Sequence, residues 1–127
     1  MFEGEYKNGM KWIGILNDDH GHLLYEINNG KGYYREFNQL NRLIFQGEHL
    51  NGERNGKGKE YNDNGFMIFE GEYLNGKRNG KGKEYNKNDK IIFEGEYLNG
   101  KKWNGIGYDT INNIIYKINN GRIYSRI

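Results

Sequence analysis

The sequence contains no cysteine, proline, alanine or valine, and only one serine and one threonine among its 127 residues. The lack of cysteine excludes disulfides and thiolate zinc sites, and it fits a reducing, cytoplasmic compartment. Long helices are not expected, because alanine is missing and an interior glycine costs about 1 kcal/mol relative to alanine. We expect strands, because isoleucine and aromatic residues carry the apolar content, while asparagine and 20 glycines supply turns.

Long apolar runs are also missing. No stretch approaches the length of a transmembrane helix, and the repeat described below begins at Phe2, so neither a membrane span nor a signal peptide is expected. The formal net charge is +2 and the sequence pI about 8.7. This pI lies below the range typical of nucleic-acid-binding domains and no groove-reading motif is present, so nucleic acid is not an expected partner.

A repeat with a period of 24 residues organises the chain, since Phe45, Phe69 and Phe93 begin nearly identical segments. The two ends, near Trp12 and Trp103, resemble each other more than they resemble the central units. We divide a single array into units at residues 2–24, 25–44 (shortened), 45–68, 69–92, 93–115 and 116–127 (a half unit).

Each full unit predicts two antiparallel strands. In Ile68 to Leu74, Phe69, Gly71 and Tyr73 share one face and the glutamates share the other. Asn75-Gly76 is a strong hairpin signal, and we expect the loop to run on to Gly80, with the second strand starting at Lys81. The recurring glycine is predicted to leave a slot for an aromatic ring of the next hairpin. The fold class is therefore all-β, an elongated antiparallel meander.

The segment F-E-G-E-Y-L-N-G-K, followed by a Gly-x-Gly pair, resembles the MORN repeat, and the resemblance covers nearly the whole chain. It is full in the units at Phe45, Phe69 and Phe93, and partial or weak in the first two. The segment G-K-G-K-E-Y-N also resembles MORN-variant repeats of some bacterial proteins, including antitoxin-like ones. The resemblance implies a single-layer sheet of stacked hairpins that acts without catalysis, as a scaffold, in dimerisation or at phosphoinositide membranes.

A single-layer sheet cannot bury both of its faces, so an exposed aromatic face is expected. Such a face usually marks an interaction site. We therefore predict binding of a protein partner or of a second copy, with an antitoxin- or immunity-like inhibitor as an alternative. The predicted contact residues are Phe69, Tyr73, Phe93, Tyr97 and Trp103.

Basic residues cluster after each Asn-Gly turn. If these loops align along one edge, they form a basic row that would hold the protein peripherally on acidic phospholipids, at about 1 kcal/mol per well-placed base. The alternative is a solvated edge that prevents aggregation. The candidate lipid contacts are Lys77, Arg78, Lys81, Lys83, Lys101 and Lys102.

No catalytic, cofactor or metal site is expected. The loop Gly76 to Gly82 has the wrong spacing for a phosphate-binding loop and precedes a strand. The pair Glu70/Glu72 has a spacing that would suit glycosidase acids, but its repetition favours pairing across strands with lysines. The lysines expected opposite the glutamates are Lys57, Lys59, Lys81 and Lys83. His20 and His22 suggest only a weak metal site.

Overall fold

A computed structural model describes residues 2–7, 10–17, 23–28 and 31–126, with side chains described from Lys31 to Tyr124. Over these residues the chain forms twelve strands and no helix long and apolar enough to cross a membrane. The strands are β1 (Phe2–Lys7), β2 (Met10–Asn17), β3 (Leu23–Asn28), β4 (Lys31–Phe37), β5 (Leu43–Leu50), β6 (Glu53–Tyr61), β7 (Met67–Leu74), β8 (Lys77–Tyr85), β9 (Ile91–Leu98), β10 (Lys101–Tyr108), β11 (Ile114–Asn119) and β12 (Arg122–Arg126).

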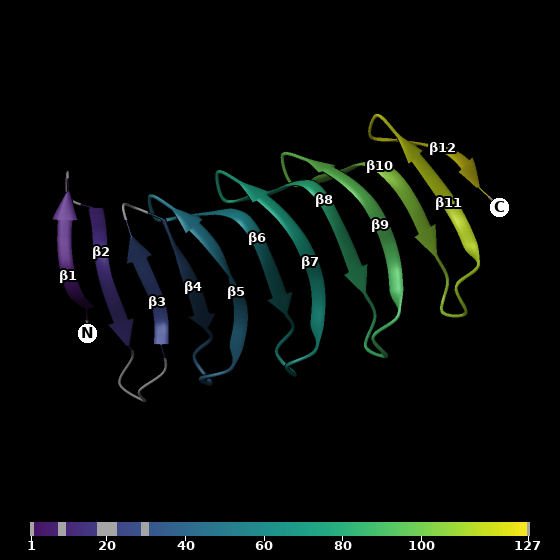
Figure 1. Cartoon of the computed structure of the whole chain (residues 1–127). Helices are drawn as coiled ribbons and strands as arrows, with labels where there is room; N and C mark the ends of the chain where they lie inside the picture. The colour runs from purple at the N-terminus through teal and green to yellow at the C-terminus, as the bar shows by residue number, and fades with distance from the viewer. Residues whose placement is uncertain (1, 8–9, 18–22, 29–30, 127) are drawn as a thin grey trace.

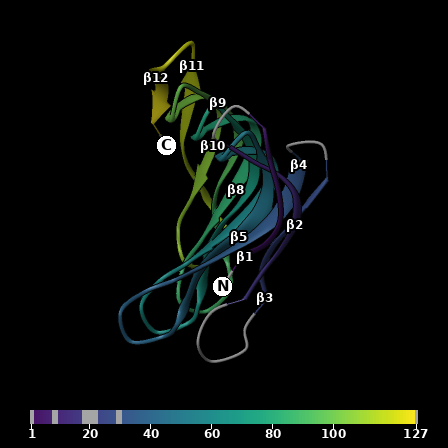
Figure 2. The ribbon, with the colours of Figure 1, turned by 90° about the vertical axis from the view of Figure 1, so that its left-hand side faces the viewer.

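All described strands belong to one open sheet in which each strand pairs with the next along the chain. Figure 1 shows this meander as an elongated row of hairpins with the two termini at opposite ends. Seen along the row, the strands are curved and the sheet twists (Figure 2). The predicted all-β antiparallel meander, with two strands in each full unit, is confirmed.

The hairpin turns along one edge are two residues long. Asn75 and Gly76 adopt φ angles of 51° and 84°, the left-handed conformation that a type I′ turn requires at both positions. The expected longer loop is therefore wrong, because β8 starts at Lys77 and pairs Lys77 with Leu74. The residues after the turn belong to the sheet, which decides the face on which Arg78 lies.

A bulge takes the place of the predicted loop. Between Gly71 and Tyr73 the register against β8 shifts, so that Glu72 faces a stretch containing Asn79 and Gly80. Gly80 has φ of 100°, which favours glycine there. The Glu72 carboxylate accepts a hydrogen bond from the Lys81 backbone N–H at 2.8 Å and so closes the bulge.

Each bulge also anchors the turn of the following unit. The Asn79 side-chain oxygen accepts a hydrogen bond from the backbone N–H of Asn99 at 3.0 Å, and Gly100 N–H donates to the Arg78 carbonyl at 2.8 Å. The same pair of contacts recurs one unit earlier, from Asn75 to Asn55 and from Gly76 to Arg54. The repeated asparagines thus join neighbouring hairpins, beyond their role in turns.

The opposite edge carries five-residue loops closed by one side chain. Asn86 accepts hydrogen bonds from the backbone N–H groups of Asn88 and Lys90 through its Oδ1 atom, at 2.9 and 3.1 Å. The positive φ falls on the fourth loop residue, Asp89 in this unit and Gly65 one unit earlier. Asn38, Asn62 and Asp109 close the other described loops in the same way.

The core lies on one face of the sheet, where aromatic rings rest against a row of glycines. The register aligns these glycines across neighbouring strands, with Gly71 opposite both Gly58 and Gly82. A Cβ atom on Gly82 would lie 2.7 Å from the Phe69 ring and 2.9 Å from the Tyr97 ring. The predicted packing role of glycine is confirmed, with one correction: the ring over Gly71 comes from Phe69 of its own strand, while the next hairpin covers Gly82.

Candidate functional site

The predicted exposed aromatic face does not exist as expected, because its rings are buried. Phe69 and Phe93 are 0% exposed, and Tyr73 and Tyr97 are 4% exposed. Trp103 is half-buried, with its ring against Gly121. The rings bury one another without a second layer of structure, because each ring packs edge-on against the next at centroid distances near 5 to 6 Å. The face that would have bound a partner is the core.

Cationic side chains complete this cover. The Arg54 guanidinium lies 3.9 Å above the centre of the Phe45 ring, Arg78 lies 3.9 Å above Phe69, and the Lys102 ammonium lies 4.7 Å above Phe93. A cation over an aromatic face is attracted by the ring quadrupole, and its alkyl stem shields the ring from water. The basic side chain after each turn therefore serves the core.

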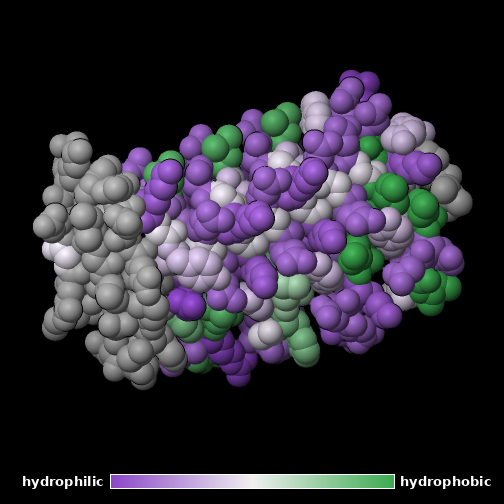
Figure 3. All heavy atoms as spheres, in the orientation of Figure 1, coloured by the Kyte–Doolittle hydropathy of each residue, from purple (hydrophilic) through white to green (hydrophobic). Residues whose placement is uncertain are grey.

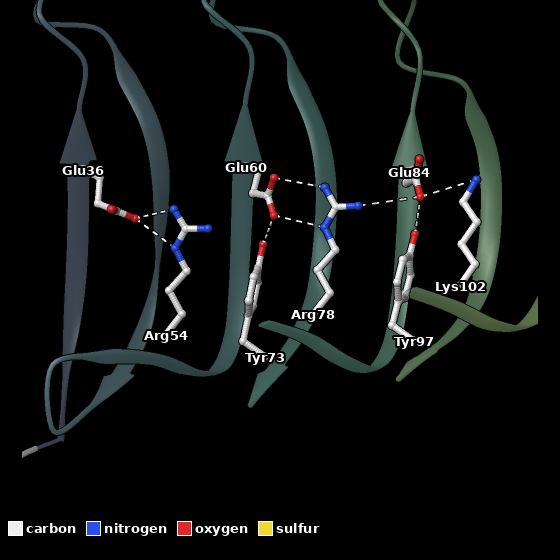
Figure 4. A network of polar contacts seen from close by, with 8 residues as sticks. All are labelled: Glu36, Arg54, Glu60, Tyr73, Arg78, Glu84, Tyr97 and Lys102. Atoms are coloured by element: carbon white, nitrogen blue, oxygen red, sulfur yellow. Dashed lines mark hydrogen bonds and ion pairs between the residues drawn. The ribbon is translucent and has the colours of Figure 1, made fainter. Parts of the chain in front are cut away.

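Carboxylates hold these cations in place, as Figure 4 shows for three successive units. Arg54 donates to Glu36 at 2.6 Å, and Arg78 donates through two nitrogens to Glu60 at 3.1 and 3.0 Å. Lys102 lies 3.7 Å from Glu84. The result is a ladder of repeated aromatic, cation and carboxylate groups along the aromatic face.

Tyrosine hydroxyls close the ladder. Tyr73 donates to Glu60 and Tyr97 donates to Glu84. Burial by itself favours the neutral form of Glu60, but the hydrogen bonds from Arg78 and Tyr73 outweigh it and lower the pKa of that carboxyl. Burial and the adjacent carboxylate raise the pKa of Tyr73, so the phenol stays protonated. These shifted groups satisfy one another, which is the signature of a structural network.

His49 interrupts the pattern in the unit at Phe45, where it replaces the tyrosine. Its Nδ1 atom is buried without a hydrogen-bond partner, and burial lowers the pKa of the imidazole. Its ring lies 4.3 Å from the ring of Tyr34. Tyr34 of β4 pairs with Gly47 of β5. At the same position in the two later units, Gly58 pairs with Gly71 and Gly82 pairs with Gly95. A tyrosine therefore occupies the position that is glycine in the later units. The smaller histidine ring makes room for that tyrosine.

This exchange predicts strong coupling between the two positions. His49→Tyr alone should destabilise the protein by about 1–3 kcal/mol, because the larger ring meets Tyr34. Adding Tyr34→Gly should recover most of that loss, since the pair then matches the Gly82 and Tyr97 arrangement. Urea unfolding of the four proteins in the double-mutant cycle measures the coupling, and additive effects of the two substitutions would contradict it.

The six predicted lipid contacts do not form one basic row. Arg78 and Lys102 lie on the aromatic face and are engaged in the ladder. Lys81 and Lys83 lie on the opposite face, where they flank Gly82. Lys77 and Lys101 sit beside the turns at the edge of the sheet and are exposed. The expected row is wrong because the basic residues alternate between the two faces of a strand.

The opposite face holds a charged trough of about 1010 Å³, which we define by its floor and walls. The backbone of the glycine row forms the floor. One wall is the first row, Lys59, Glu70, Lys83 and Glu94, and the other is the second row, Lys57, Glu72, Lys81 and Glu96, with Gln46, Glu48 and Tyr33 at one end. Hydrophilic atoms dominate the visible face of the described part in Figure 3, whereas apolar atoms gather at the C-terminal end and the turn edge.

The trough charges face one another across strands but are not paired. The register sets Lys59 against Glu70 and Lys83 against both Glu70 and Glu94, which confirms the predicted cross-strand arrangement. Among the described side chains, however, no wall lysine lies within 4.0 Å of a wall glutamate, and the ion pairs that are present belong to the ladder. Tyr85 instead donates to Glu70 at 2.5 Å. The wall lysines are therefore exposed and available.

Two candidate sites weighed from the sequence can be compared with the described part of the chain. The stretch Gly76 to Gly82 forms a turn, a bulge and a strand, so it cannot wrap a phosphate in the manner of a nucleotide-binding loop. No group of three or more His, Asp or Glu side chains is placed to hold a metal among the described residues. His20 and His22 lie outside those residues.

No family model matches the sequence, and a search of curated proteins found no significant match. A function is therefore inferred from the surfaces described above. Sequence reasoning placed the trough lysines and glutamates opposite one another but did not recognise them as a site. The signal was present in the pairs of like charge that flank each glycine, Lys57 with Lys59 and Glu70 with Glu72.

Proposed function

We propose that this chain is a non-catalytic scaffold that binds protein partners, and that the charged trough is the surface that holds them. The observation that carries the proposal is the trough itself. It combines wall lysines and glutamates that have no ion-pair partner among the described side chains with a floor free of side chains, over five neighbouring strands. Unpaired charges of both signs in a hollow favour a partner with complementary charges.

The remaining features support a binding role over chemistry. The residues with strongly shifted pKa values lie in the ladder, where their neighbours satisfy them, or are tyrosines that donate to wall glutamates. The sequence pattern resembles MORN repeats, and a regular meander of hairpins is compatible with a MORN-type array. An antitoxin- or immunity-like inhibitor would be the same scaffold acting on one partner. Binding to acidic phospholipids is the weaker candidate, because Lys77 and Lys101 alone of the six predicted contacts remain at the turn edge.

The test compares two variants that carry the same charge change. Lys59→Glu/Lys83→Glu reverses two trough lysines, whereas Lys87→Glu/Lys90→Glu reverses two exposed lysines of a loop outside the trough. Proteins captured from source cells by the wild type are purified and titrated against each variant. We expect the trough variant to weaken direct binding at least about tenfold and the loop variant to leave it unchanged. Equal binding to both variants, or no captured protein that binds directly, would overturn the proposal.

A further inference from the structure

The charged trough carries a regular pattern of charge that goes beyond the presence of both signs. On β6 and β8 both wall positions are lysines, and on β7 and β9 both are glutamates. The sign thus alternates from strand to strand in both rows. Because neighbouring strands lie about 4.8 Å apart, like charges recur about every 9.6 Å along the trough.

Few protein surfaces can match this pattern. Alternate residues of an extended peptide recur at about 6.6 Å, and a helix presents one stripe whose like charges recur at about 10.5 Å for a seven-residue spacing. Neither supplies two parallel rows. A second trough supplies both rows, with the same spacing along and across the strands.

We infer that the trough binds a second copy of this chain face to face, an inference that rests on the proposed function of the trough as a protein-binding surface. The charges meet favourably when a two-fold axis runs parallel to the strands between β7 and β8. That axis places β6 opposite β9 of the second copy and β7 opposite β8, so each lysine strand faces a glutamate strand. A two-fold axis perpendicular to the strands in the plane of the sheet would instead place every strand on itself and oppose like charges.

The arrangement specifies the contacts. Lys57 meets Glu96 of the second copy and Lys59 meets Glu94, while Lys81 meets Glu72. Each pairing is made twice because the interface is isologous, so the assembly closes as a dimer and does not grow into a filament. The facing side chains are charged and, apart from the half-buried Glu70 and Glu94, exposed. The dimer is therefore held by salt-sensitive contacts with water between the two floors.

The experiment is a charge exchange at Lys57 and Glu96, which are exposed and whose side chains donate or accept no hydrogen bond described for the chain. Sedimentation equilibrium in low salt should show a dimer for the wild type. Lys57→Glu or Glu96→Lys alone should raise the dimer Kd at least about tenfold, because both symmetry-related pairs become repulsive. The double variant Lys57→Glu/Glu96→Lys should return to within about threefold of the wild type, and an equimolar mixture of the two single variants should form a heterodimer.

A matched control distinguishes this geometry from a general charge effect. Lys57→Glu/Glu53→Lys has the same net charge as the wild type, but Glu53 lies beside a turn outside the trough, so it should not restore the dimer. Restoration by this control, failure of the Glu96 exchange to restore, or a monomeric wild type at about 200 μM in low salt would overturn the inference. A monomeric wild type that still binds a different protein through Lys59 and Lys83 would leave the proposed function standing.

Discussion

Gly71→Ala should lower the free energy of unfolding by at least about 3 kcal/mol, although it adds a single methyl group. The new Cβ atom would lie 2.6 Å from the Lys81 carbonyl oxygen, 2.7 Å from the Gly82 Cα atom and 2.7 Å from the Phe69 ring. The first two neighbours are backbone atoms of the paired strand, which cannot rotate away. Relief requires β7 and β8 to separate at the centre of the array, where the ring of Phe69 is fully buried.

The control is Gly65→Ala, in the loop before β7. A Cβ atom there meets nothing within 4 Å, but the φ of 86° strains any residue other than glycine. That strain alone costs about 1–2 kcal/mol. Urea unfolding followed by tryptophan fluorescence should therefore separate the two variants clearly. A Gly71→Ala protein as stable as Gly65→Ala would mean that the sheet yields to the added methyl group, and that the glycine row is not a steric requirement.

The fold was predictable from sequence because several local signals agree. The 24-residue period set the unit, the alternation around Phe69 set the strand, and Asn75-Gly76 marked the turn. These signals depend on neighbours in sequence, and the sheet pairs each strand with the next one, so local information was sufficient. The register across each hairpin stayed open at the level of sequence, because it depends on the length of the turn.

The candidate site was harder to predict because it depends on register. In the expected six-residue loop, Arg78 would be one of several solvent-exposed basic residues. The two-residue turn instead pairs Arg78 with Tyr73 and directs it to the aromatic face. Because Arg78 covers Phe69, the aromatic rings form a buried core and not the exposed surface that was predicted. Alternation along β8 then places Lys81 and Lys83 on the opposite face, on either side of Gly82. Sequence composition alone did not show that a single strand serves both a core and a trough.

Arg78→Ala is expected to destabilise the protein by about 2–3 kcal/mol, even though the side chain belongs to a charged residue near the surface. The substitution removes the guanidinium 3.9 Å above Phe69 and leaves Glu60 with the Tyr73 hydroxyl as its remaining described hydrogen-bond donor. Loss of a buried ion-pair partner costs about 3–5 kcal/mol. Because Arg78 and Glu60 remain 24% and 20% exposed, water replaces part of the lost interaction and the expected loss is smaller.

Arg78→Lys is the matched control, because the chain already has lysine at this position one unit later. Lys102 lies 4.7 Å from the centre of the Phe93 ring and 3.7 Å from Glu84, so an ammonium can serve both roles without the two-nitrogen contact. We expect this variant to lose about 1 kcal/mol. Equal losses for alanine and lysine would show that the fork geometry of the guanidinium matters and the charge does not.

The dependence on pH should separate the charge from the packing of the Arg78 stem. The pKa of Glu60 is lowered in the folded protein from its ordinary value of 4.5, so the unfolded chain binds more protons as the solution is acidified below that value. The stabilisation from ionised Glu60 is therefore complete above about pH 4.5 and is lost as the pH falls through the folded pKa. The stability difference between wild type and Arg78→Ala should shrink over the same interval. A difference that stays constant from pH 7 to pH 3 would assign the effect of Arg78 to its cover over Phe69 alone.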